Sequence, residues 1–139
     1  MKFGKTIGDF TPIVCDNFSK FNIFLFNVKI ASDKYIHNGK HYVLVDCTSF
    51  IDTLTKINEF ARTKFSNFSS CFDSHNNTIV VKLPFRYNRY QINWKGLSTS
   101  GDILDQAYCN IDIQLVGITT SLSKCFCSFK CISFGVLQT

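Results

Sequence analysis

One segment of this chain has the apolar period of an α-helix: Ser49-Phe50-Ile51-Asp52-Thr53-Leu54-Thr55-Lys56-Ile57-Asn58-Glu59-Phe60-Ala61-Arg62-Thr63-Lys64-Phe65. Apolar side chains recur at spacings of three and four, which places them on one helix face; they are Phe50, Leu54, Ile57, Ala61 and Phe65. Ser49 is positioned to cap the helix, with Asp52 three residues later in capping-box register and on the favourable side of the helix dipole. The stretch predicts a helix that covers one face or end of a sheet.

The segments on both sides of this helix have the period of two that is typical of β-strands. Before the helix, strands are predicted at Phe10–Cys15, Ile23–Ile30 and His41–Cys47. Asn38-Gly39, ahead of the third, is a typical hairpin turn. After the helix come four more candidates, at Ile79–Arg86, Tyr90–Lys95, Ile111–Ile118 and Lys124–Ile132, with a connection at Gly96–Asp102 and a short helical turn at Ile103–Tyr108. The predicted class is mainly β with one mid-chain α-helix (α+β).

Length and composition place this chain among single-domain globular proteins. It has 139 residues, 45% hydrophobic and 18% charged, with a net charge of +5. That balance excludes a disordered chain and predicts one domain over residues 1–139. No run reaches the roughly 18 consecutive apolar residues that a membrane span needs, so we expect no membrane partner. The N-terminus lacks the apolar core of a signal peptide, which predicts an intracellular location, in the cytoplasm or nucleus.

The segment Lys82–Lys95 combines positive charge with aromatic rings. It contains four cations, four rings and no acid, and no Asp or Glu occurs between Asp73 and Asp102. Lys and Arg neutralise phosphates, and exposed rings stack on unpaired bases at about 1–3 kcal/mol per base. The alternative is that Phe85, Tyr90, Ile92 and Trp94 fill a core while the cations are merely solvated, because large aromatic residues dominate cores.

The alternation along this segment predicts which side chains face inward. Tyr90, Ile92 and Trp94 share one parity, which we assign to the core. Arg89, Gln91, Asn93 and Lys95 share the other parity and face solvent. In the last strand, Lys124, Phe126, Ser128 and Lys130 likewise share one parity, so two cations and a ring lie together on its polar face.

The end of the chain resembles a known family. The segment Asp112-Ile113-Gln114-Leu115-Val116-Gly117-Ile118, a polar loop, and then Phe129-Lys130-Cys131-Ile132 resembles the closing strand pair of OB-fold single-stranded-DNA-binding proteins from large DNA viruses and phages. Pro84-Phe85-Arg86-Tyr87 fits the same picture, and the similarity covers about residues 78–136. The resemblance implies an OB-like β-barrel with a helix between its third and fourth strands. Four strand candidates after the helix, instead of two, require an additional hairpin, and Lys and Arg are sparser than in many nucleic-acid binders.

Residues for catalysis or metal binding are not arranged in recognisable patterns. Of seven cysteines, Cys125 and Cys127 are one residue apart, whereas zinc sites start from cysteines two to four residues apart and need a second ligand pair. His37 and His41 flank the Asn38-Gly39 turn, which predicts surface positions. We therefore expect no metal, no cofactor and no enzymatic activity. The enzymatic alternatives are a cysteine nucleophile beside a histidine and a local Asp102–Asp105 pair.

The sequence predicts a non-catalytic protein that binds single-stranded nucleic acid with little sequence preference, and DNA is the expected strand. The predicted contacts are phosphate-binding Lys82, Arg86, Arg89, Lys95, Lys124 and Lys130, and stacking rings Phe85, Tyr87, Trp94 and Phe126. The alternative is a β-rich interaction or assembly subunit, such as a viral accessory or structural protein, whose rings contact a protein partner or a second copy of the chain.

Overall fold

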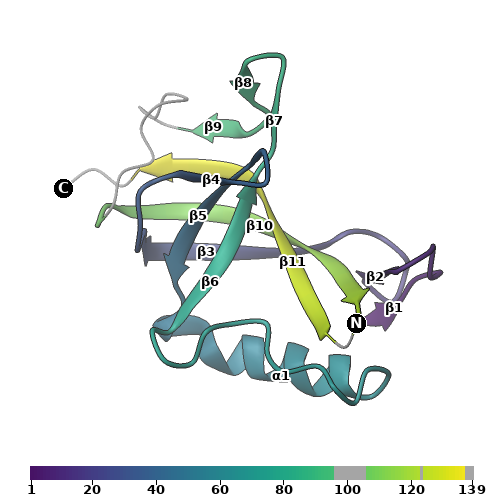
Figure 1. Ribbon diagram of the computed structural model, residues 1–139. Helices are drawn as coiled ribbons and strands as arrows, with labels where there is room; N and C mark the ends of the chain where they lie inside the picture. Colours follow the sequence, from purple (N-terminus) through teal and green to yellow (C-terminus); the bar gives the residue numbers. More distant parts are fainter. Residues whose placement is uncertain (96–105, 123, 137–139) are drawn as a thin grey trace.

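The computed structural model describes residues 1–95, 106–122 and 124–136 and consists of eleven strands and one mid-chain helix (Figure 1). The predicted mainly β class with one helix is confirmed. The strands are β1 (Lys2–Phe3), β2 (Phe10–Val14), β3 (Phe21–Lys29), β4 (Tyr35–His37), β5 (Lys40–Asp46), β6 (Thr78–Leu83), β7 (Phe85–Arg86), β8 (Arg89–Tyr90), β9 (Asn93–Lys95), β10 (Tyr108–Ser121) and β11 (Lys124–Val136). The Gly96–Asp102 connection, the Asp102–Asp105 pair and residues 103–105 of the predicted helical turn lie outside the described residues.

Most strands belong to one curved sheet with the order β1-β2-β10-β11-β6-β5-β4. β3 also pairs with β10, and β9 also pairs with β11. All neighbours are antiparallel except that β11 runs parallel to both β6 and β9. The free side of β3 meets β5 through one isolated bridge between Ile30 and Val45 and through the Ala31 amide, which donates to the Leu44 carbonyl at 2.8 Å. Strand ladders alone therefore do not close the sheet into a barrel.

The long strand β10 has two partners on one edge. Its first half pairs with β3, and its second half pairs with β2 at Gly117–Thr119. Register shifts follow Asp112 and Leu115 in its pairing with β11, and such bulges bend a strand. This bending turns one sheet around a shared interior, where apolar side chains from many strands meet, among them Leu25, Val43, Val45, Ile79, Val81, Leu83, Ile111, Ile113, Phe129 and Phe134.

The helix α1 (Ile51–Arg62), preceded by a single 3₁₀ turn (Thr48–Phe50), covers one end of the strands (Figure 1). Its predicted stripe is confirmed, because Leu54, Ile57 and Ala61 are buried. The predicted Ser49 cap is wrong, since no side chain caps α1. Instead, the carboxylate of Asp46 accepts hydrogen bonds from the backbone amide and the hydroxyl of Thr48, at 2.9 and 2.6 Å. The chain enters the helix through this bend rather than through a capping box.

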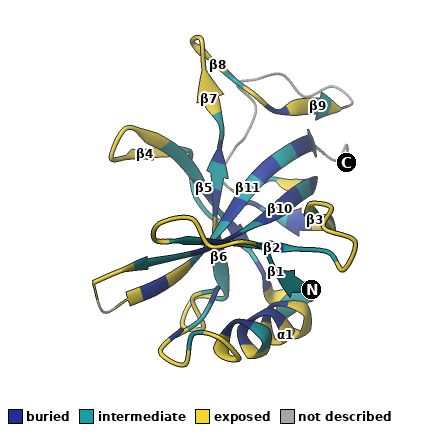
Figure 2. Cartoon of the chain, turned by 90° about the vertical axis from the view of Figure 1, so that its right-hand side faces the viewer, coloured by how far each residue is buried: buried dark blue, intermediate teal, exposed yellow. Residues whose placement is uncertain are grey.

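Two hairpins project from the sheet. β4 and β5 are joined by the predicted Asn38-Gly39 turn, whose φ angles are +52° and +76°. β7 and β8 form a separate two-stranded hairpin at the end of the molecule opposite α1 (Figure 1). The short strands β4 and β7 consist of exposed residues (Figure 2). Among the described residues, no helix has the length and apolar character needed to cross a membrane.

Candidate functional site

A groove of about 920 Å³ crosses the outer side of the sheet. The strands β4, β5, β6, β10 and β11 all contribute to it. Its lining includes the aromatic residues Tyr35, Tyr42 and Phe126 and the cations Lys40, Lys82 and Lys130. Among the described residues that line the groove, none is Asp or Glu.

The aromatic rings of the groove come from both of its flanking hairpins. Tyr35 and Tyr42 pair directly across the β4–β5 hairpin, and their rings stack with centroids 5.7 Å apart and an interplanar angle of 28°. Burial, and secondarily the neighbouring Tyr42, raise the pKa of Tyr35 above its ordinary value. Phe126 of β11 is 48% exposed. These rings therefore present accessible π-faces on both sides of one groove.

The cations of the groove form a cluster around Lys82. Its pKa is lowered, first because the ammonium is partly buried and then because Lys40, Lys130 and Arg86 repel its charge. In residues 1–95, 106–122 and 124–136, the two ion pairs are the N-terminal amine with Asp16 and Lys95 with Asp112. None of the four clustered cations is therefore neutralised by a described carboxylate, and an anionic ligand would relieve their mutual repulsion.

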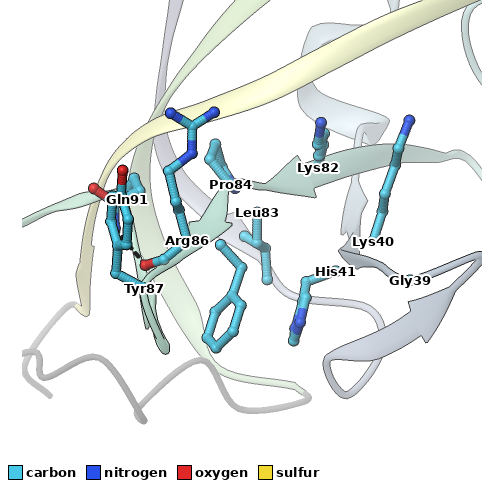
Figure 3. A pocket seen from close by; sticks show the side chains of 10 residues that line it. Gly39, Lys40, His41, Lys82, Leu83, Pro84, Arg86, Tyr87 and Gln91 are labelled. Atoms are coloured by element: carbon cyan, nitrogen blue, oxygen red, sulfur yellow. Dashed lines mark hydrogen bonds between the residues drawn. The ribbon is translucent and has the colours of Figure 1, made fainter.

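A second cavity of about 410 Å³ adjoins the groove and shares Lys40 and Lys82 with it. Figure 3 shows the side chains of Lys40, Lys82 and Arg86 extending to one side and the ring of His41 extending to the other. The ring of Phe85, which is 42% exposed, stacks on His41 with centroids 4.3 Å apart at 24°. Cations thus border this cavity on one side, and a pair of flat rings lies on the other.

The ring pair is held in place by Tyr90. The Tyr90 hydroxyl lies 3.0 Å from Nδ1 of His41, and its ring meets Phe85 edge-on at 5.0 Å. Burial raises the pKa of Tyr90, so its hydroxyl stays protonated at neutral pH. The predicted inward parity of Tyr90 agrees with this position. Tyr90 therefore orients the two rings without facing a ligand itself.

The β7–β8 hairpin carries Arg86 and Tyr87 to the rim of the second cavity. Tyr87 and Asn88 both have positive φ angles, +56° and +60°, the conformation of a tight hairpin turn. The Gln91 side-chain amide donates to the Arg86 carbonyl at 2.9 Å, and the Gln91 backbone amide donates to the Pro84 carbonyl at 2.7 Å. The Tyr87 side chain at the tip is 81% exposed.

The structure brings together some of the predicted site residues and separates others. Lys82, Phe126 and Lys130 meet in the groove, and Lys82, Phe85, Arg86 and Tyr87 meet in the adjoining cavity. The remaining four line neither cavity: Arg89, Trp94, Lys95 and Lys124.

These four residues lie in three different environments. Arg89 and Trp94 line a third hollow, beside Ile132, and the half-buried Trp94 ring packs edge-on against Phe134 at 5.6 Å. Lys95 lies 3.7 Å from the carboxylate of Asp112. Lys124 is exposed at the start of β11. The parity that assigned Trp94 to the core is therefore the interpretation that the structure supports.

The sequence prediction missed three of the groove's aromatic residues and cations, namely Tyr35, Lys40 and Tyr42, and also missed His41 of the second cavity. The signal was present in the Asn38-Gly39 turn. A two-residue turn fixes the register of its hairpin, and this register pairs Tyr35 with Tyr42. Since Tyr42 also pairs with Lys82 across β5–β6, the turn and the next ladder together bring these residues to one surface.

Within the described residues, no three His, Cys, Asp or Glu side chains gather as a metal site. The described cysteines are unbridged, and several are buried. Burial raises the pKa of Cys47 to about 11, and a hydrogen bond with Cys71 together with burial raises that of Cys127. These thiols are protonated at neutral pH and are poor nucleophiles.

Comparisons with known proteins give no relative for this chain: no family model, curated protein or solved structure matches it.

Proposed function

We propose that this protein binds single-stranded nucleic acid in the groove, without catalysis. The observation that carries the proposal is the combination of three rings with three clustered cations in a groove whose described lining contains no carboxylate. Phosphates would contact Lys40, Lys82 and Lys130, and bases would stack on Tyr35, Tyr42 and Phe126. A duplex offers its phosphates but not its base faces, so stacking of this kind favours unpaired strands.

The same proposal includes an OB-like barrel. The order of strand partners supports it. The strands β5, β6, β11, β10 and β3 pair in that order, and the Ile30–Val45 bridge then connects the end of β3 to β5. The parallel pairing of β6 with β11 joins the third and fifth of these strands in chain order. The helix departs from the expected arrangement, because in this order it follows the second strand instead of the third.

The groove has the position that ligands take in OB folds. Those folds bind oligonucleotides on the face of their second and third strands, between the loop after the first strand and the loop that joins the last two. In this chain the corresponding strands are β5 and β6, and the corresponding connections contain β4 and the β10–β11 turn. The residues of the groove come from β4, β5 and β6 and from β10 and β11, the two strands that this turn joins.

A salt-titrated binding assay with single-stranded DNA, duplex DNA and RNA of one sequence tests the proposal. We expect single strands to bind more tightly than the duplex and affinity to fall steeply with salt, because bound cations release counterions. The affinities for single-stranded DNA and for RNA show which kind of strand the protein prefers. Negligible binding of all single strands at low salt would refute the proposed function.

A second candidate function, assembly through a protein surface, is favoured by a different observation. Phe24, Phe26 and Tyr108 are 58%, 67% and 51% exposed on the adjoining strands β3 and β10, and none of them lines the groove or the second cavity. Exposed aromatic patches of this kind mark protein contacts. Sedimentation velocity of the protein and of a Phe24→Ser, Phe26→Ser variant tests it, since assembly through this patch requires a wild-type oligomer that the variant dissociates.

A further inference from the structure

The second cavity has a different character from the groove that it adjoins. It lies at the end of β6 beside the projecting β7–β8 hairpin, where Leu83 and Pro84 contribute apolar lining. Its volume of about 410 Å³ is at the lower end of the range for small-molecule sites, roughly 300–1,000 Å³. It therefore has room for one small ligand, such as a single nucleotide unit, rather than for a length of strand.

The cations that line the cavity gather on one side of it. Lys40, Lys82 and Arg86 extend along one side (Figure 3), within reach of an anion. The stacked His41–Phe85 pair lies on the other side, and Tyr90 holds that pair in position. A phosphate beside these cations would offset their mutual repulsion.

The density of positive charge favours a doubly charged anion. Lys82 lies among Lys40, Lys130 and Arg86, whose charges act on it together. A phosphodiester inside a strand carries one negative charge, whereas a terminal phosphate monoester carries nearly two at neutral pH. Because the Coulomb energy scales with the charge of the ligand, the cluster attracts the monoester more strongly.

We propose that the second cavity binds the terminal phosphate monoester of a strand whose adjoining nucleotides lie in the groove. The inference rests on the proposed function and adds a preference for phosphorylated ends. Lys40 and Lys82, shared by the two cavities, join the end site to the strand path. Arg86 supplies planar, paired donors that suit a phosphate.

Competition binding with unlabelled oligothymidylates tests the inference. Their length of about 12 nucleotides lies within the roughly 4–16 nucleotides that one OB fold contacts. Three competitors are compared: one with hydroxyl ends, one with a 5′-phosphate and one with a 3′-phosphate. We expect one phosphorylated end to improve affinity about fivefold or more, from its additional charge. The phosphorylated competitor with the higher affinity shows whether the cavity binds the 5′ end or the 3′ end.

The variants Arg86→Ala and Arg89→Ala form a matched pair, because the two residues face each other across the β7–β8 hairpin. Both side chains are exposed, and only Arg86 lines the second cavity. Arg86→Ala should abolish the gain from phosphorylation, and Arg89→Ala should retain it. Equal affinity for all three competitors, or a gain that survives Arg86→Ala, would overturn the inference while leaving single-strand binding intact.

The mononucleotide alone separates the inference from the proposed function. Thymidine 5′-monophosphate, thymidine 3′-monophosphate and unphosphorylated thymidine are each titrated into the protein. The readout is the chemical-shift change of the protein amides. Shifts at Lys40, His41 and Arg86 with a monophosphate but not with thymidine support the end site even if long strands do not bind. Absence of both strand binding and monophosphate shifts overturns both proposals.

Discussion

Tyr42 and Lys82 pair directly across the antiparallel β5–β6 ladder, and both line the groove. Directly opposed residues lie on the same face of a sheet, with Cβ atoms about 4.5–5.5 Å apart. A ring and a cation are therefore neighbours at the centre of the candidate site. This is the combination that a nucleotide requires, because its base and its phosphate are also neighbours.

Removal of two groove cations should weaken strand binding and its dependence on salt. For Lys82→Ala, Lys130→Ala, we expect the slope of log affinity against log salt to become shallower by about 1.4, since each phosphate contact on a single strand contributes about 0.7. Lys56→Ala, on the exposed side of α1, is the control and should leave the slope unchanged. An unchanged slope in the double variant would place the phosphates elsewhere.

Loss of a groove ring should lower affinity without altering the salt slope. Tyr42→Leu and Phe126→Leu keep an apolar side chain but remove the π-face, and each should cost about 1–3 kcal/mol of binding free energy if a base stacks there. Phe24→Leu removes an exposed ring outside the groove and serves as the control. Isothermal titration calorimetry at one salt concentration provides the comparison. Equal affinities of the groove and control variants would contradict stacking at these two rings.

The fluorescence of Trp94 should change little when a strand binds. The Trp94 ring, on β9, packs against Phe134 of β11, and Trp94 lines neither the groove nor the second cavity. We expect Trp94→Phe to retain the wild-type affinity and the tryptophan emission of the wild-type protein to change little on saturation with oligothymidylate. Strong quenching that salt reverses would instead extend the binding surface to β9.

The strand periods and the turns were readable from the sequence because both depend on neighbouring residues. The inward face of β6 follows from the alternation of Ile79, Val81 and Leu83, and Asn38-Gly39 gives its hairpin directly. The prediction of a Ser49 cap was wrong because the local sequence allows two ways to begin the helix, a Ser49 capping box or a turn at Asp46 and Thr48. The carboxylate of Asp46 binds Thr48 first, and α1 begins only at Ile51.

The composition of the groove could not be read from the sequence, because it depends on pairings between distant segments. β6 and β11 are parallel, with Phe129 opposite Val81 and Lys130 opposite Lys82. A parallel pair has no local turn to fix its register. Without that pairing, nothing in the sequence separates Lys130, which lies in the groove, from Lys95, which lies beside Asp112.

The Asp46 carboxylate should make stability depend on pH in the acid range. Its pKa is lowered from 3.8, chiefly by the hydrogen bonds from the Thr48 side chain and backbone. The folded state then binds its proton less readily than the unfolded state, so the stabilisation is complete above pH 4 or so and is lost as pH falls through the lower folded pKa. Asp46→Asn keeps an acceptor oxygen but cannot titrate there. Urea unfolding at pH 7 and about pH 3 should show a smaller acid loss for this variant than for the wild type.

Gly117 is required where β10 passes closest to β2. A Cβ atom at this position would lie 2.4 Å from the Thr11 carbonyl oxygen and 2.9 Å from Cα of Pro12, both backbone atoms. Backbone in the middle of a sheet cannot move aside without breaking its ladder, so we expect Gly117→Ala to lower the free energy of unfolding by at least about 1–3 kcal/mol.

Gly8→Ala separates this steric effect from the conformational preference of glycine. Gly8 has a φ of +60°, so alanine is strained there, but nothing lies within 4 Å of the added Cβ. Its cost should be about 1–2 kcal/mol, the penalty for an L-residue in left-handed backbone. Urea unfolding of both variants gives the comparison. A Gly117→Ala protein as stable as the wild type would mean that β2 does not approach β10 this closely, because only that approach forbids the methyl group.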